Sequence, residues 1–184
     1  MVKEQIEENA ERPVGSSLNN LNILLIEDSE TDAYIIRRVL SSHMRHPCCV
    51  IHAESMATAK SIIEKSGNID SIDLILLDLG LPDTENNNDT FARMNEIKEK
   101  IPVIILTNLQ DHEFALSTMN SGAEDYVVKS AISKNPEVIC DAIDFAVCRH
   151  RRIEELQEEA DHDLKEKDMV ISWMSGDYNC TKTE

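Results

Sequence analysis

The chain carries five short, mostly apolar runs that alternate with segments of helical periodicity. The runs cover residues 22–26, 47–53, 72–77, 102–106 and 125–128, and they are apolar at consecutive positions rather than at every second one. Strands that are buried on both faces have this pattern, which is typical of parallel sheets covered by helices. We therefore expect five parallel strands.

The segments between and after these runs carry apolar residues at helical spacing. Helices are predicted over residues 31–43, 55–65, 90–99, 111–121 and 136–150, and the last continues through Ala160. This alternation predicts an α/β fold, a doubly wound five-stranded parallel sheet with right-handed crossovers and an extended C-terminal helix. Ligands of such sheets bind beyond the carboxyl ends of the strands.

Composition narrows the classes of partner. The 184 residues carry a net charge of −17, which disfavours nucleic acid and anionic lipid as partners, and no apolar run is long enough to span a membrane. Five cysteines without a paired spacing are typical of reduced thiols, so we expect a cytoplasmic protein. We also expect a flexible leader over residues 1–20, one domain over 21–150 and an acidic helical tail over 151–184.

Polar side chains follow four of the predicted strands. Glu27 and Asp28 follow the first, Asp78 the third, Thr107 the fourth and Lys129 the fifth. Taken singly, each has an ordinary explanation, such as a helix cap at Asp28 or a solvated lysine at 129. Together they predict one site, in which the carboxylates bind Mg²⁺ and the ammonium and hydroxyl groups bind an anion. Such a site suits transfer of a phosphoryl group to a carboxylate.

Four sequence fragments, in order, resemble the receiver domains of two-component response regulators. The fragments are Ile23–Ser29, Leu76–Asp83, Val103–Thr107 and Gly122–Lys129, and the resemblance covers about residues 21–150. It implies a flavodoxin-like receiver fold that acts as a signalling switch rather than as a metabolic enzyme.

The resemblance also implies a role for each site residue. Asp78 would take a phosphoryl group from a phosphohistidine of a sensor histidine kinase or a phosphotransfer protein. Mg²⁺ would be held by Glu27, Asp28, Asp78 and the carbonyl of Gly80. Thr107 and Lys129 would bind the phosphoryl oxygens, and Tyr126 would turn inward when Thr107 moves. The signal would then pass to a downstream protein target.

The sequence departs from the family at several positions near the site. Ser130 follows Lys129 where the family usually has a proline, and Asn108 follows Thr107 where a small residue is usual. Gly80 and Leu109 occupy positions that commonly tune the lifetime of the acyl phosphate. The Asn-rich segment 84–89 is expected to form a mobile loop, and Asn tolerates the left-handed conformation that glycine would supply there.

Two other functions remain open. A receiver-like scaffold that is not phosphorylated and acts through its C-terminal helix is favoured by Ser130, Asn108 and the Asn-rich segment. A phosphatase with an aspartyl-phosphate intermediate usually has a second Asp two residues after the nucleophile, where this chain has Gly80, so it ranks last.

The tail and a His/Cys cluster complete the pattern. Ile153, Leu156 and Ala160 have heptad spacing, but the repeat is not sustained, so a solvated helix and a partner-binding or homodimerising helix are both open. Trp173, Met174 and Tyr178 are expected to be exposed apolar candidates for docking, with the surface of the receiver itself as one option. We assign ordinary packing and surface roles to the cluster of His43, His46, Cys48, Cys49 and His52.

Overall fold

Five parallel strands form one sheet at the centre of the molecule. The computed structural model describes residues 20–65, 72–97, 101–108 and 122–175. The strands are β1 (Leu21–Ile26), β2 (Cys48–Ala53), β3 (Leu74–Asp78), β4 (Val103–Thr107) and β5 (Asp125–Val128). Their order is β2-β1-β3-β4-β5, and every neighbouring pair is parallel. The predicted doubly wound fold is confirmed.

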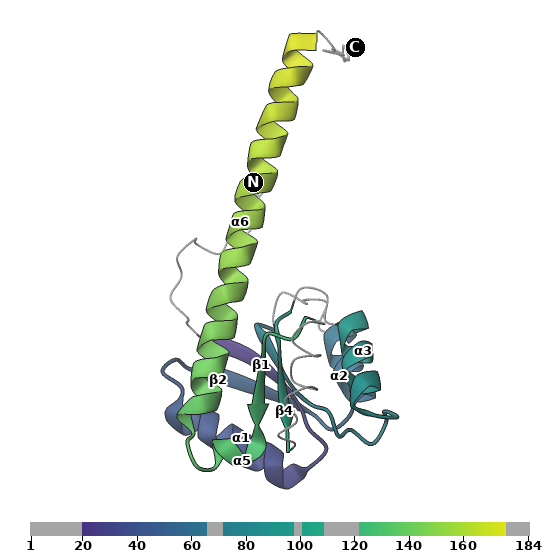
Figure 1. The fold of residues 1–184 in the computed structure, drawn as a ribbon, viewed down its shortest axis with the longest axis vertical. Coiled ribbons are helices and arrows are strands. Elements are labelled where there is room, and N and C mark those ends of the chain that lie inside the picture. The colour runs from purple at the N-terminus through teal and green to yellow at the C-terminus, as the bar shows by residue number, and fades with distance from the viewer. Residues whose placement is uncertain (1–19, 66–71, 98–100, 109–121, 176–184) are drawn as a thin grey trace, which may run out of the picture.

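Helices cover both faces of this sheet (Figure 1). They are α1 (Glu30–His43), α2 (Met56–Lys65), α3 (Asn87–Ile97), α5 (Lys129–Ile132) and α6 (Glu137–Ser175). One apolar core joins α1, α5 and α6 to one face, and a second joins α2 and α3 to the other. The helix predicted over 111–121 lies outside the described residues.

Consecutive strand residues point to opposite faces, which explains why the strands are apolar throughout. In β1, Leu21, Ile23 and Leu25 enter the first core, whereas Leu24 and Ile26 enter the second. All five residues are fully buried. A strand between two helical layers has no solvated face that polar residues could occupy.

Two helix ends next to the sheet are held by side chains. Ser29 caps α1 and accepts a hydrogen bond from the Asp32 backbone N–H at 3.3 Å. At the start of α2, Ser55 accepts from Thr58 N–H, as expected of a cap, and the Asp83 carboxylate accepts from the backbone N–H groups of the first two helical residues. Asp83 thus fixes the loop after β3 to the end of α2.

The Asn-rich segment differs from its prediction. Helix α3 begins at Asn87, three residues before the predicted start. Asn86 accepts a hydrogen bond from Asp89 N–H at 3.0 Å, and the hydroxyl groups of Thr84 and Thr90 lie 2.6 Å apart. Among the described residues Asn20 is the one non-glycine with a positive φ, so no Asn of this segment uses the left-handed conformation. Hydrogen bonds at the start of the helix hold the segment instead.

Helix α6 has two parts with different surroundings. Its first part buries Ile139, Ile143 and Ala146 against the sheet, and Arg45, in the loop after α1, forms ion pairs with Asp141 and Asp144. From Ile153 onward the helix is largely exposed and projects away from the sheet and the helices that cover it (Figure 1).

The outer end of α6 lies within the expected helical tail. The helix continues past Ala160 to Ser175. Trp173 is 70% exposed, so it is not docked on the sheet domain in this structure and stays an exposed candidate for docking. The Met174 side chain and Tyr178 lie outside the described residues. Within the described part of the chain, no helix is long and apolar enough to cross a membrane.

Candidate functional site

The carboxyl ends of β1, β3, β4 and β5 surround a cavity of about 290 Å³. Its walls include six residues that the sequence places at the site: Glu27, Asp28, Asp78, Gly80, Thr107 and Lys129. Adjacent parallel strands end at the same edge of the sheet, which is why residues so far apart in the sequence meet here.

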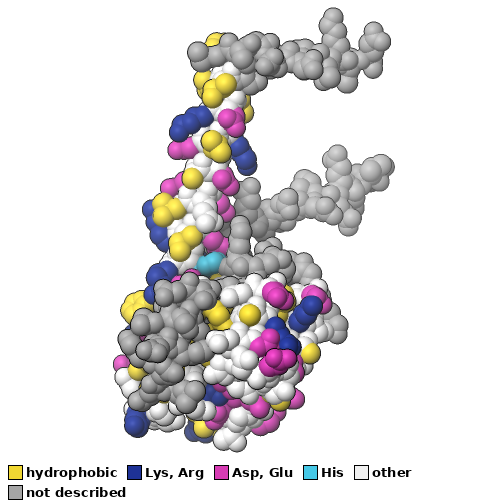
Figure 2. Space-filling view, turned by 45° about the vertical axis from the view of Figure 1, so that its right-hand side comes forward, with side chains coloured by type: hydrophobic (Ala, Val, Ile, Leu, Met, Phe, Trp, Pro, Cys, Tyr) yellow, Lys and Arg dark blue, Asp and Glu magenta, His cyan; other side chains and the backbone are white. Residues whose placement is uncertain are grey.

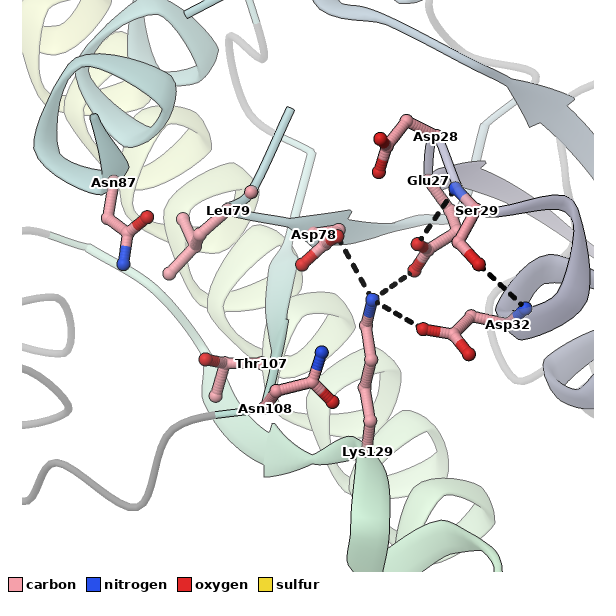
Figure 3. A pocket seen from close by; sticks show the side chains of 11 residues that line it. Glu27, Asp28, Ser29, Asp32, Asp78, Leu79, Asn87, Thr107, Asn108 and Lys129 are labelled. Carbon is pink, nitrogen blue, oxygen red and sulfur yellow. Dashed lines mark hydrogen bonds and ion pairs between the residues drawn. The ribbon is translucent and has the colours of Figure 1, made fainter. Parts of the chain in front are cut away.

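The Lys129 ammonium group is the centre of the site (Figure 3). Its Nζ lies 2.6 Å from Glu27 Oε2, 3.0 Å from Asp78 Oδ2 and 3.1 Å from Asp32 Oδ2. The Lys129 side chain is 9% exposed and that of Glu27 is fully buried. Because water screens the buried charges of Lys129, Glu27 and Asp78 poorly, each of these three charges depends on the others for its stability.

Burial and these contacts shift two pKa values. Burial of the Glu27 carboxylate raises its pKa from 4.5 to about 7, with a contribution from the charge of Asp78, although the hydrogen bond with Lys129 opposes the rise. Burial disfavours the charged form of Lys129, but the contacts with Glu27 and Asp78 outweigh it and raise the Lys129 pKa above its usual value of 10.5. Lys129 therefore carries its charge throughout the neutral pH range.

Three carboxylates at this site form a group suited to a hard divalent cation. Oxygen atoms of Glu27, Asp28 and Asp78 all lie within 4.8 Å of one another. Carboxylate oxygens with room for water are the ligands that Mg²⁺ prefers, and the exposed Asp28 leaves one side of the group open to solvent. The donor set therefore fits Mg²⁺. Ser29, not Asp28, is the N-cap of α1, which leaves the Asp28 carboxylate available.

Thr107 and Tyr126 lie on neighbouring strands but have different surroundings. Thr107 is 4% exposed and lines the cavity, and it pairs in register with Val128. Tyr126 pairs with Ile105, two residues earlier along β4, and packs half-buried against the core beneath α2 and α3. The structure thus brings Thr107 into the site and leaves Tyr126 next to it, outside the cavity wall.

The cavity is also lined by three polar residues that the sequence analysis did not assign to the site. They are Ser29 and Asp32, at the start of α1, and Asn87, at the start of α3. Helices that follow parallel strands begin at the same sheet edge as the strand ends. Polar residues in their first turns were therefore the available signal.

The sequence departures at Ser130 and Asn108 have visible structural consequences. No cis peptide bond occurs in the described ranges, and Lys129 begins the short helix α5 with Ser130 exposed beside it. Asn108 is exposed and lines the cavity. The cavity mouth next to Thr107 thus carries an amide side chain (Figure 3).

His52 contacts the site from β2. Its Nε2 lies 2.8 Å from the backbone carbonyl oxygen of Glu27, which fixes the chain just after β1. Cys48 is half-buried on the same strand and Cys49 is exposed. A structural role for His52 agrees with the packing assigned to this cluster.

The fold and the site define a receiver domain, and comparison with known proteins supports the same class. The family model of the response regulator receiver domain matches residues 23–144. The chain therefore belongs to the response regulator receiver family.

Individual relatives agree with this class. The two-component response regulator ORR1 of Oryza sativa subsp. japonica is 28% identical over 125 residues, covering 61% of this chain and 51% of that protein. The transcriptional regulatory protein KdpE of Staphylococcus aureus is 31% identical over 109 residues, covering 58% and 42%. A crystal structure of a response regulator receiver domain protein from Clostridium thermocellum has a TM-score of 0.59 and 26% identity, covering 72% and 98%. The chain spans about half the length of the first two relatives.

Proposed function

We propose that this chain is a phospho-accepting receiver that takes a phosphoryl group on Asp78 and passes the signal on through protein contacts. One observation carries the proposal: the buried Lys129 ammonium lies 3.0 Å from Asp78, in a cavity that also contains the carboxylates of Glu27 and Asp28. Proteins of this family act as signalling switches.

Asp78 is the acceptor in this proposal because of its place between the charges. It ends a fully buried strand, its side chain is 11% exposed, and it faces the solvent-open cavity. A carboxylate oxygen of Asp78 would attack the phosphorus of a phosphohistidine. The new O–P bond would form as the P–N bond breaks, and the leaving imidazole would take its proton from solvent.

Lys129 and Thr107 would receive the transferred group. The Lys129 ammonium already contacts Asp78, so it would need little reorganisation to bind a phosphoryl oxygen there. The Thr107 hydroxyl borders the same cavity from the next strand. Glu27, Asp28, Asp78 and the Gly80 carbonyl would hold Mg²⁺. When bound, this ion would offset the negative charge of the phosphoryl group.

The switch would follow from the new charge. A phosphoryl group adds about −1.5 to −2 charge at Asp78 and so attracts Thr107 and Lys129. Tyr126, on the strand paired with Thr107's strand, would move further inward with it. The readout surface would include β5 and the first part of α6.

The partners follow from this chemistry. We propose that a sensor histidine kinase or a phosphotransfer protein supplies the group, and that a downstream protein reads the result. The receiver would span residues 21–150 and the helical tail residues 151–184. The exchange would take place in the cytoplasm, as the cysteine usage led us to expect.

Intact-mass spectrometry after incubation with acetyl phosphate tests the proposal. With Mg²⁺ the protein is expected to gain one phosphate, and removal of Mg²⁺ by a chelator should prevent the gain. Asp78→Asn should abolish it, whereas Asp83→Asn, a change of an exposed carboxylate in the following loop, should leave it intact. An unchanged mass of the unmutated protein with Mg²⁺ would favour the scaffold that is not phosphorylated.

A further inference from the structure

The projecting part of α6 has a row of exposed apolar side chains on one side. Ile153 and Leu156 are each 47% exposed, Leu164 is 58% exposed and Ile171 is 63% exposed. Ala160 lies between them and is also exposed. We refer to these five residues as the α6 stripe. Figure 2 shows hydrophobic side chains along this part of the helix, with acidic side chains beside them.

The spacing of the α6 stripe keeps it on one side of a nearly straight helix. Its first four members follow at intervals of three, four and four residues, and Ile171, seven residues after Leu164, falls at the same repeat position as Ala160. This is an 11-residue repeat, whose period of about 3.67 residues per turn is close to the 3.6 of an α-helix. The heptad seen at its start is therefore the first part of a longer repeat. Between Ile153 and Ile171, Lys167 occupies the one repeat position that is not apolar.

The flanks of the stripe are acidic. Between Ile153 and Ser175 the chain has eight Asp and Glu residues but two Lys residues. At 100° per residue, Glu159 and Asp163 lie along one edge of the stripe, and Asp161 and Asp168 lie along the other. A docking helix would therefore meet an apolar centre between two rows of carboxylates.

We propose that the α6 stripe binds a basic amphipathic helix of a partner protein. The apolar row supplies the buried contact, and the carboxylates on both edges select Lys and Arg on the partner. A second copy of this chain fits poorly, because it would bring the same acidic edges together. This binding does not depend on phosphorylation of Asp78.

The probe for the first test is a synthetic peptide of 22 residues with Leu at the same 11-residue spacing and Lys at the flanking positions. Its binding to the full-length, unphosphorylated protein is measured by fluorescence anisotropy. We expect at least tenfold tighter binding than that of a scrambled peptide of identical composition, and a dissociation constant that rises with salt. Equal binding of both peptides, or no binding of either, would overturn the proposal.

Substitutions on α6 test whether the peptide binds at the α6 stripe. Leu156→Ser combined with Leu164→Ser is expected to weaken binding at least tenfold. Met169→Ser is the matched control, because Met169 is 68% exposed and lies on the opposite side of the helix. This variant should leave binding unchanged. Asp161→Lys combined with Asp163→Lys should weaken binding and flatten its salt dependence. Similar losses in all three variants would contradict a specific surface.

Sedimentation of the same protein without peptide tests the alternative, in which the α6 stripe binds a second copy of this chain. We expect a monomer. A dimer that the substitutions at Leu156 and Leu164 convert to a monomer would show that the stripe binds a second copy instead, and would overturn the proposal. Thermal unfolding and helical circular dichroism of every variant check that the receiver and the helix remain folded.

Discussion

Replacing Lys129 with Met is the most informative change to the site, because it removes one charge from among three carboxylates. The ammonium lies 2.6 Å from Glu27 and 3.0 Å from Asp78, and both carboxylates are nearly or fully buried. Removal of one partner from a buried ion pair costs about 3–5 kcal/mol. Asp32 is one-third exposed, so water screens its repulsion. We therefore expect a loss of about 3 kcal/mol in unfolding free energy without Mg²⁺.

Urea unfolding near pH 8, with and without Mg²⁺, measures this effect. Mg²⁺ at about 100 times its dissociation constant stabilises a folded protein by about 2.7 kcal/mol, so it should restore most of the loss. It should also bind Lys129→Met more tightly than the unmutated protein, since a nearby positive charge is gone. Lys134→Met, at an exposed lysine, is the control and should change little. A loss below about 1 kcal/mol without Mg²⁺, or no recovery with it, would refute the reasoning.

Three further outcomes follow from the structure. In the folded protein Glu27, with its pKa near 7, keeps a proton between pH 4.5 and 7 that the unfolded chain has lost. The free energy of unfolding in Mg²⁺-free buffer should therefore fall as the pH rises through this window. Glu27→Gln should reduce this slope, and an unchanged slope would count against the raised pKa of Glu27. Asp83→Ala removes the acceptor of two N–H groups at the start of α2 and should cost about 1 kcal/mol in urea unfolding, whereas an unaltered midpoint would exclude this cap. A Cβ atom at Gly80 would lie 3.7 Å from Asp78 Oδ2, an ordinary contact distance, so the Gly80→Val variant should fold normally. Its side chain should shield Asp78 from water and slow the loss of phosphate several-fold, whereas faster loss would argue against shielding.

The sheet and most of the cavity were predictable because both depend on strand ends. A strand buried on both faces is apolar until it leaves the sheet, so Asp78, Thr107 and Lys129 mark where β3, β4 and β5 end. Parallel strands share an edge, so these residues had to converge. The functional roles assigned to them stay predictions.

Contributions from helix starts were harder to anticipate. Asp32 and Asn87 reach the cavity from the first turns of α1 and α3, where Asp and Asn are also common as caps. Asp83 caps α2, a helix that precedes it in the sequence, and no local pattern indicates such a contact. Single-sequence periodicity fixes neither the direction of a side chain in a first turn nor its long-range partner.

The continuous course of α6 beyond Ala160 was hard to anticipate for a different reason. Its apolar residues follow an 11-residue repeat, which looks like a failing heptad beyond Ala160. The acidic composition of this segment is equally typical of a solvated helix. The helix persists to Ser175 nonetheless.

Localisation of the phosphate by fragmentation mass spectrometry of the phosphorylated full-length chain tests the central claim most directly. The protein is treated with acetyl phosphate and Mg²⁺, cleaved, and the modified peptide is sequenced. We expect one phosphate, on Asp78, and none in a parallel sample without Mg²⁺. A phosphate on another residue, or incorporation that does not depend on Mg²⁺, would contradict the account.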